Sequence, residues 1–229
     1  MFYKDILQGE FVERVNRFTV RINLNGSIVS AHLANSGRLG ELLIPGRKAG
    51  ILYKGTPGRK TKYDFVMIRN EKGVWVSVDA TLPNKLFCEG FKQGIIKEFR
   101  KYEQIKKEVK CGTSRLDFVL KNQQSRCFIE VKSVTLVIDK TGFFPDAPTA
   151  RGVKHITELI NLKNQGSCSA VIFIVQRPDA RQVSPNRETD PDFYNILKDA
   201  HQAGVSVFAL NCRTGKNRIE IKQQIPVIF

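Results

Sequence analysis

Residues 115–132 read RLDFVLKNQQSRCFIEVK and contain two apolar stretches around a polar turn. Successive side chains of a strand point to opposite faces, so Glu130 and Lys132 share one face. Asp117 is the single acidic residue in the first stretch. If the two stretches pair as a hairpin, Asp117 and Glu130 approach each other on one face, with Lys132 beside them.

Two converging carboxylates form a hard-oxygen site that suits Mg²⁺ or Mn²⁺. A neighbouring lysine can orient a water molecule or stabilise charge that develops on a phosphate. The residues therefore predict a metal-assisted site at Asp117, Glu130 and Lys132. The alternative is a half-exposed strand whose charged residues merely face solvent.

The segment Asn84–Tyr102 has apolar residues at helical spacing. On a continuous helix, Glu98 falls on the same stripe as Phe91, Ile95 and Tyr102, because each residue advances by about 100°. A carboxylate on an apolar face requires a partner. Glu98 is therefore predicted to complete the site, or to form a structural salt bridge with Lys132.

Downstream, strands are expected at 104–110, 116–120, 127–137, 170–175 and 205–210. Helices are expected at 149–164 and 193–203. Runs of strands followed by strand–helix–strand crossovers predict a mixed α/β sheet with helices on its faces. This C-terminal domain is assigned to residues 83–229.

Residues 1–82 lack a convincing helix and are assigned to a separate domain. Strands are expected at 11–24, 27–33, 49–54, 64–69 and 74–78, and Asn25-Gly26 is a strong hairpin signal between the first two. Five strands in about eighty residues suit a Greek-key barrel of the OB type. An SH3-like barrel or an open sandwich would give a similar pattern.

The chain of 229 residues has 37 Lys and Arg against 22 Asp and Glu, for a net charge of +15. Residues 1–82 contribute +6 and residues 83–229 contribute +9. Such an excess favours a polyanionic partner, although two ordinary basic surfaces would give the same totals. With no amphipathic anchor or polybasic tail, DNA is favoured over a membrane as the partner. The oligomeric state stays open.

Several classes of protein are disfavoured. The N-terminus lacks a signal-peptide pattern, and the longest apolar run, Ala170–Val175, is too short to span a bilayer. The five cysteines are widely spaced and predict neither a disulfide framework nor a zinc finger. They are interpreted as small buried residues of a cytoplasmic protein.

The order of Glu98, Asp117, Glu130-x-Lys132 and a crossover helix resembles the PD-(D/E)XK nuclease fold. This resemblance implies metal-dependent phosphodiester hydrolysis. Asp117 and Glu130 would be metal ligands with the Val131 carbonyl as a candidate third, Lys132 would assist the attacking water, and Glu98 would hold metal-bound water. Leu116 stands where that pattern has proline.

A second resemblance covers nearly the whole chain. The segments 14–18, 35–39, 45–46, 129–136 and 144–155 resemble the sugar fermentation stimulation protein A family. The resemblance implies an N-terminal OB-like domain, a C-terminal nuclease-like domain and DNA binding. The family's link to sugar utilisation is regulatory and defines no reaction.

Several polar residues are candidates for contacts with phosphate. The candidates are Arg14, Arg17, Asn35, Arg38, Arg151, Lys154 and His155. Arg151 and His155 are four residues apart and share a helix face, whereas Lys154 points elsewhere. Asp146 stands at a predicted helix start, where it either caps that helix or takes part in catalysis.

Exposed aromatic residues of a barrel can stack on bases. The candidates are Phe18, Tyr53, Phe65 and Trp75, most of which are expected in the core. Three functions follow from these features: a DNA-binding protein with a metal-dependent nuclease site, a non-catalytic DNA-binding regulator, and an enzyme of carbohydrate metabolism. The sequence offers no spaced carboxylate pair of the kind that a glycosidase uses, which disfavours the third function.

Overall fold

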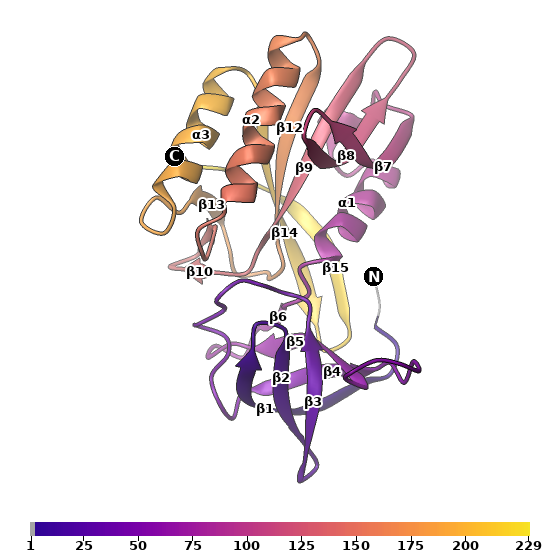
Figure 1. Cartoon of the computed structure of the whole chain (residues 1–229), viewed down its shortest axis with the longest axis vertical. Helices are drawn as coiled ribbons and strands as arrows, with labels where there is room; N and C mark the ends of the chain where they lie inside the picture. The colour runs from indigo at the N-terminus through magenta and orange to yellow at the C-terminus, as the bar shows by residue number, and fades with distance from the viewer. Residues whose placement is uncertain (1–2) are drawn as a thin grey trace.

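The N-terminal domain is a closed β-barrel, shown at the bottom of Figure 1 in a computed structural model that describes residues 3–229. Its strands are β1 (Ile6–Asn16), β2 (Thr19–Leu24), β3 (Ser27–Leu33), β4 (Lys48–Tyr53), β5 (Tyr63–Arg69) and β6 (Trp75–Ser77). The sheet order is β3-β2-β1-β4-β5-β6, and β3 also pairs with β5. That pairing closes the first five strands into a ring and confirms the OB-type barrel.

Two predicted strands of the barrel differ from the observed ones. The stretch 11–24 is not one strand, because the chain reverses at Arg17-Phe18 and β1 pairs antiparallel with β2. The strand at Trp75 extends the sheet beside β5 and lies outside the closed ring. The Asn25-Gly26 turn is confirmed: both residues have positive φ, and Leu24 pairs with Ser27 across it.

The C-terminal domain is built on a mixed sheet, as predicted, but it has six strands where five were expected. Its order is β15-β14-β12-β9-β8-β7, and β9, β12 and β14 are parallel. The strands are β7 (Gln104–Cys111), β8 (Ser114–Lys121), β9 (Arg126–Val134), β12 (Cys168–Val175), β14 (Ser206–Gly215) and β15 (Arg218–Ile225). A smaller sheet joins β10 (Val137–Ile138), β11 (Thr141–Phe144) and β13 (Gln182–Pro185).

Helices cover both faces of this large sheet (Figure 1). The helices α2 (Ala150–Asn164) and α3 (Pro191–Gln202) lie on one face, and α1 (Leu82–Lys92) lies on the other. Because side chains alternate along each strand, the sheet contributes to a hydrophobic core on both of its faces. Phe118 and Ile129 face α1, whereas Val119 and Phe128 face α2. No helix within residues 3–229 is both long and apolar enough to cross a membrane.

The predicted helix 84–102 is wrong in its second half. Gly94 adopts a φ of 65°, in the left-handed region, and the chain leaves the helix after Lys92. A short 3₁₀ turn, Lys97–Phe99, follows. Glu98 therefore does not share a helix face with Phe91, as the helical spacing had predicted.

The prediction that the cysteines form no disulfide framework is wrong for one pair. Cys127 of β9 and Cys168 of β12 are direct neighbours in the parallel register and form a disulfide. Cys88, Cys111 and Cys212 are free and buried. Proximity of residues on parallel strands depends on the intervening crossover, so cysteine spacing alone did not reveal the pair.

The two domains meet where the chain leaves β12. Gln176 accepts a backbone hydrogen bond from Ser77, and its side chain donates to Asp79 O and to Ser133 Oγ. Arg177, which is 4% exposed, donates to Thr135 O and to both carboxylate oxygens of Asp179 at 2.7 Å. Asn70 of the barrel donates to Asp179 at 3.4 Å. Hydrogen bonds of the charged side chains of Arg177 and Asp179 therefore contribute to this junction.

We expect Arg177→Ala to lower the free energy of unfolding by about 1–3 kcal/mol, because the Thr135 carbonyl and the Asp179 carboxylate lose a buried donor. Urea unfolding followed by circular dichroism measures the change. The matched control is Arg213→Ala, because the Arg213 side chain is mostly exposed and lies 3.9 Å from Glu220. In this control the free energy of unfolding should change by no more than about 0.5 kcal/mol. Equal losses in the two variants would contradict the role of Arg177.

Candidate functional site

The candidate site lies where the pairing of β8 and β9 opens. The ladder runs from Lys121↔Arg126 to Phe118↔Ile129. Continuing this register places Asp117 opposite Glu130, where the Val131 N–H donates to Asp117 Oδ2 at 2.8 Å. The Asp117 side chain therefore replaces a backbone acceptor at the point where the strands separate.

Asp117 is also held from the α1 side of the sheet. Asn84 Nδ2 donates to Asp117 Oδ1 at 2.8 Å. Burial raises the pKa of Asp117 above its ordinary value, and repulsion from Glu130 raises it further. The hydrogen bonds from Val131 and Asn84 offset part of this increase in the Asp117 pKa. Asp117 is thus a buried carboxylate whose two oxygens are both held by hydrogen bonds.

Glu130 is almost fully buried, with 3% of the residue exposed. Its Oε1 accepts a hydrogen bond from Lys132 Nζ at 2.7 Å and lies 2.5 Å from His155 Nδ1. Burial acts to raise the pKa of Glu130, but attraction to Lys132 and the hydrogen bonds from His155 and Lys132 outweigh it and lower that pKa. The arrangement stabilises an ionised carboxylate inside the protein.

His155 links this site to α2. An ionised carboxylate only accepts hydrogen bonds, so the imidazole donates from Nδ1 to Glu130. Its Nε2 then serves as the acceptor for Arg151 Nε, 3.4 Å away. The residue is buried. His155, predicted to contact phosphate, is thus placed as an internal partner of Glu130.

The oxygen atoms at this site fit a divalent cation in type. Glu130 Oε2 is buried and has no hydrogen-bond partner in the described part of the chain. Both the N–H and the C=O of a strand residue lie on the same edge, so the Val131 carbonyl is directed toward Asp117 like its N–H. Asp117, Glu130 and this carbonyl are the oxygens that could hold the ion. Within residues 3–229, no three His, Cys, Asp or Glu side chains form a metal-binding group.

Glu98 does not join these residues. It is exposed in the 3₁₀ turn Lys97–Phe99, so the prediction that it faces the core is wrong. The residue that reaches the site from this region is Asn84, in the first turn of α1. Its sequence signal is weak: a polar residue next to Leu82-Pro83 at a helix start.

Two of the predicted phosphate ligands have internal roles instead. The Arg14 guanidinium donates to the backbone carbonyls of Arg17, Asn35, Gly37 and Arg38. Asn35 is buried: its Nδ2 donates to Val78 O, and its Oδ1 accepts the Gly37 N–H. These two side chains shape the loop rather than present it to a ligand.

Asp146 connects this loop to the C-terminal domain. Thr149 caps α2 by accepting the Gly152 N–H at 3.0 Å, so the prediction that Asp146 is the cap is wrong. Asp146 Oδ2 instead accepts the Leu39 N–H at 3.3 Å. A Cβ at Gly37 would lie 2.4 Å from the same oxygen, so glycine is required for the two loops to approach.

The remaining predicted ligands are exposed cations: Arg17, Arg38, Arg151 and Lys154. Arg17 and Arg151 line a cavity of about 390 Å³ between the barrel and the N-terminus of α2. We call it the Arg151 cleft. Ser133, which directly follows Lys132, also lines it. The cleft therefore brings together cations of both domains, and Asp117, Glu130 and Lys132 are not in its lining.

The aromatic candidates divide by exposure. Phe18 and Tyr53 are 45% and 60% exposed, and the Arg17 guanidinium lies 5.4 Å from the centre of the Phe18 ring. Phe65 alone of the four is buried in the barrel core, so the expectation that most of these aromatic residues lie in the core is wrong. Trp75 is half-buried beneath Arg69, 5.8 Å from its ring centre.

Family comparisons match both parts of this chain. The model described as "Sugar fermentation stimulation protein RE domain" matches residues 81–218, and the "SfsA N-terminal OB domain" matches residues 12–78. The chain belongs to the sugar fermentation stimulation protein family. The predicted family membership is thereby confirmed.

Relatives in this family match along nearly their whole length. The homologue of Desulforamulus reducens is 47% identical over 225 residues, which cover 97% of this chain and 92% of the relative. That of Caldanaerobacter subterraneus is 41% identical, covering 98% and 97%. A solved structure, "The structure of Pyrococcus Furiosus SfsA in complex with Ca2+", superposes with a TM-score of 0.92 at 30% identity, covering 100% and 98%.

We expect Lys132→Met to lower the free energy of unfolding by about 3–5 kcal/mol in metal-free buffer, because it leaves the buried Glu130 charge without its cation. Replacing the carboxylate as well, in Glu130→Gln/Lys132→Met, should restore part of this loss. Urea unfolding of both variants measures the coupling. Lys198→Met, at an exposed position on α3, is the matched control, and a loss as small as in that control would contradict the ion pair.

Proposed function

We propose that this protein binds DNA and hydrolyses phosphodiester bonds at a divalent-metal-dependent site formed by Asp117, Glu130 and Lys132. The observation that carries the proposal is the opposition of Asp117 and Glu130 at the open end of the β8–β9 pair, with Lys132 bonded to Glu130. Family membership gives no reaction, so the proposal depends on this geometry.

The cation is the first requirement of the proposal. Mg²⁺ or Mn²⁺ would be held by oxygens of Asp117, Glu130 and Val131, and would polarise a phosphoryl oxygen and neutralise developing charge. The Glu130 oxygen that lacks a partner supports this assignment. The Pyrococcus furiosus relative, whose structure is described as a complex with Ca²⁺, supports a divalent cation in the family.

The side chains of this chain supply positioning and charge. Lys132 is 9% exposed and carries a cation next to the carboxylates, where it can orient the attacking water and stabilise the phosphate oxygens. His155 fixes the orientation of Glu130 through its Nδ1 hydrogen bond. Asn84 fixes Asp117 in the same way. Both carboxylates are therefore oriented before a substrate arrives.

Nucleic acid would approach this site through the Arg151 cleft. The net charge of +15 attracts a polyanion, Arg17 and Arg151 line the cleft, and Arg151 donates to His155, which bonds Glu130. Phe18, exposed at the turn between β1 and β2, offers a surface for base stacking. Contacts through phosphate would apply to single-stranded and double-stranded DNA alike.

A second function, non-catalytic DNA binding in regulation, is favoured by a specific observation. Both oxygens of Asp117 already accept hydrogen bonds, and Glu130 Oε1 is shared by Lys132 and His155. Such a satisfied network can serve as a structural element that links β9 to α2. Cleavage assays separate the two functions.

We expect the wild-type chain to cleave DNA in Mg²⁺ or Mn²⁺ and to be inactive in EDTA. Lys132→Met should lower the cleavage rate by about 100-fold or more, because a positioned charge is lost, while DNA binding stays within a few-fold. Gel assays on single-stranded and double-stranded DNA and on RNA, with Lys198→Met as the control, measure both quantities.

Two outcomes of these assays would count against a nuclease. Binding without cleavage of any substrate in either metal would leave the regulatory function as the better account. Cleavage that persists unchanged in Lys132→Met would place the activity elsewhere. Circular dichroism at the assay temperature confirms that each variant is folded.

DNA affinity should fall steeply as salt rises, because each phosphate contact releases counterions. Arg17→Ala and Arg151→Ala should each reduce the slope of log K against log salt by about 1, whereas Lys198→Ala should not change it. Fluorescence anisotropy with a labelled oligonucleotide at several salt concentrations measures the slopes. A salt-insensitive affinity, or equal slopes in all variants, would contradict the assignment of the cleft.

A further inference from the structure

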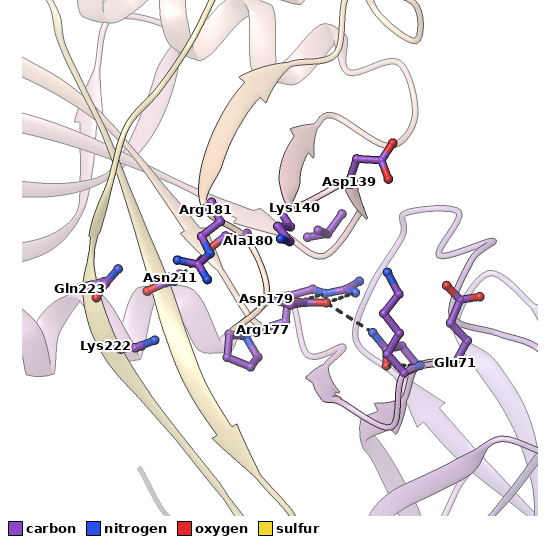
Figure 2. Close-up of a pocket in the computed structure, with 14 residues that line it drawn as sticks. Glu71, Asp139, Lys140, Arg177, Asp179, Ala180, Arg181, Asn211, Lys222 and Gln223 are labelled. Atoms are coloured by element: carbon purple, nitrogen blue, oxygen red, sulfur yellow. Dashed lines mark hydrogen bonds and ion pairs between the residues drawn. The ribbon is translucent and has the colours of Figure 1, made fainter.

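A second cavity lies at the domain junction and shares no lining residue with the Arg151 cleft (Figure 2). It has a volume of about 290 Å³. We call it the Arg181 cavity. The barrel contributes the turn after β5, residues 70–72, and the C-terminal domain contributes the β10–β11 turn, the segment 177–181 and parts of β14 and β15. Its walls thus come from both domains.

Cations predominate in the lining of the Arg181 cavity. The five are Lys72, Lys140, Arg177, Arg181 and Lys222, against the acids Glu71, Asp139 and Asp179. Arg177 and Asp179 neutralise each other through their paired hydrogen bonds. Figure 2 shows the Glu71 and Asp139 carboxylates on the far side from Arg181 and Lys222. Positive charge therefore remains unbalanced around Arg181 and Lys222.

The polar framework of the cavity is fixed before any ligand binds. Arg177 and Asn211 are both almost fully buried, at 4% and 2% exposure. Asn211 Nδ2 donates to Ala180 O at 3.1 Å, while its Oδ1 has no partner among the described residues. The Arg181 N–H donates to Lys140 O at 2.7 Å. This bond ties the segment that carries Arg181 to the β10–β11 turn.

That turn has an uncommon backbone conformation. Asp139 and Lys140 have φ values of 45° and 66°, in the left-handed region that favours glycine. Both central residues of a two-residue hairpin turn adopt positive φ, and the pairing of Ile138 with Thr141 makes Asp139-Lys140 such a turn. The tight turn brings both residues into the cavity lining, and the Asp139 carboxylate points away from Arg181 (Figure 2).

We propose that the Arg181 cavity binds a small phosphate-bearing anion. Arg181 can bond phosphate oxygens with two parallel N–H groups, and Lys140 and Lys222 supply point charges that neutralise a dianion. The volume is at the lower end of the range for small-molecule sites, which suits a phosphate ester of a small metabolite rather than a polymer. The proposal does not depend on nuclease activity.

Ligand binding at this position would act on the domain junction. Lys72 of the barrel and Lys222 of β15 both line the cavity, so an anion that contacts both would favour the present arrangement of the domains. Arg177, in the wall of the cavity, also donates to Thr135, three residues after Lys132. The cavity is thereby connected to the β9 strand that carries the candidate site.

The test uses the full chain titrated with inorganic phosphate, pyrophosphate and glycerol 3-phosphate at constant ionic strength. Calorimetry should show saturable binding of at least one probe, and thermal unfolding should shift upward with it. Arg181→Ala and Lys222→Ala should each weaken the affinity about tenfold or more. Lys198→Ala should leave it unchanged.

Three results would overturn the proposal. The first is no saturable binding of any probe, or a thermal shift that sodium chloride reproduces. The second is an affinity that both cavity variants retain. The third is a loss of oligonucleotide affinity in Arg181→Ala as large as in Arg17→Ala, which would assign the cavity to the nucleic-acid surface. None of these results depends on whether the protein cleaves DNA.

Discussion

The buried charge of Glu130 is the constraint on which the C-terminal domain depends. A carboxylate inside a sheet costs several kcal/mol unless cations and donors surround it. Lys132 meets this requirement from the same strand, two residues away, and His155 meets it from α2. The requirement therefore fixes the position of α2 over β9 as well as the side-chain orientation, and the same contacts leave one Glu130 oxygen available to a ligand.

Part of the site was predictable because it depends on short-range periodicity. Strand alternation alone places Glu130 beside Lys132, and a hairpin register places Asp117 opposite them. Glu98 was mispredicted because a helical projection assumes an unbroken helix, whereas the left-handed backbone at Gly94 ends this one. The partners Asn84 and His155 lie 33 and 25 residues away in sequence from the carboxylates they contact, so the local pattern could not indicate these two contacts.

The barrel shows why the fold was easier to predict than its binding surface. Its strands follow from β-rich segments and one Asn-Gly turn, whereas the break between β1 and β2 and the place of β6 outside the closed ring needed the structure. The number of charged residues does not show which arginine is bonded within the protein and which can contact a ligand. Arg14 and Arg17 are three residues apart, yet Arg14 donates to four loop carbonyls while Arg17 lies at the surface. That difference depends on the loop at 35–38, which tertiary contacts bring beside β1.

The domain junction and the candidate site are parts of one polar network. Ser133, on β9, and Thr135, directly after β9, accept hydrogen bonds from Gln176 and Arg177, which directly follow β12. Gln176 also bonds the barrel at Ser77 and Asp79. A rotation of the barrel against the sheet must therefore break or re-form bonds to the residues next to Lys132. A ligand between the domains can in this way alter the geometry around Glu130 without touching it, because only two residues separate Lys132 from the Thr135 carbonyl that Arg177 holds.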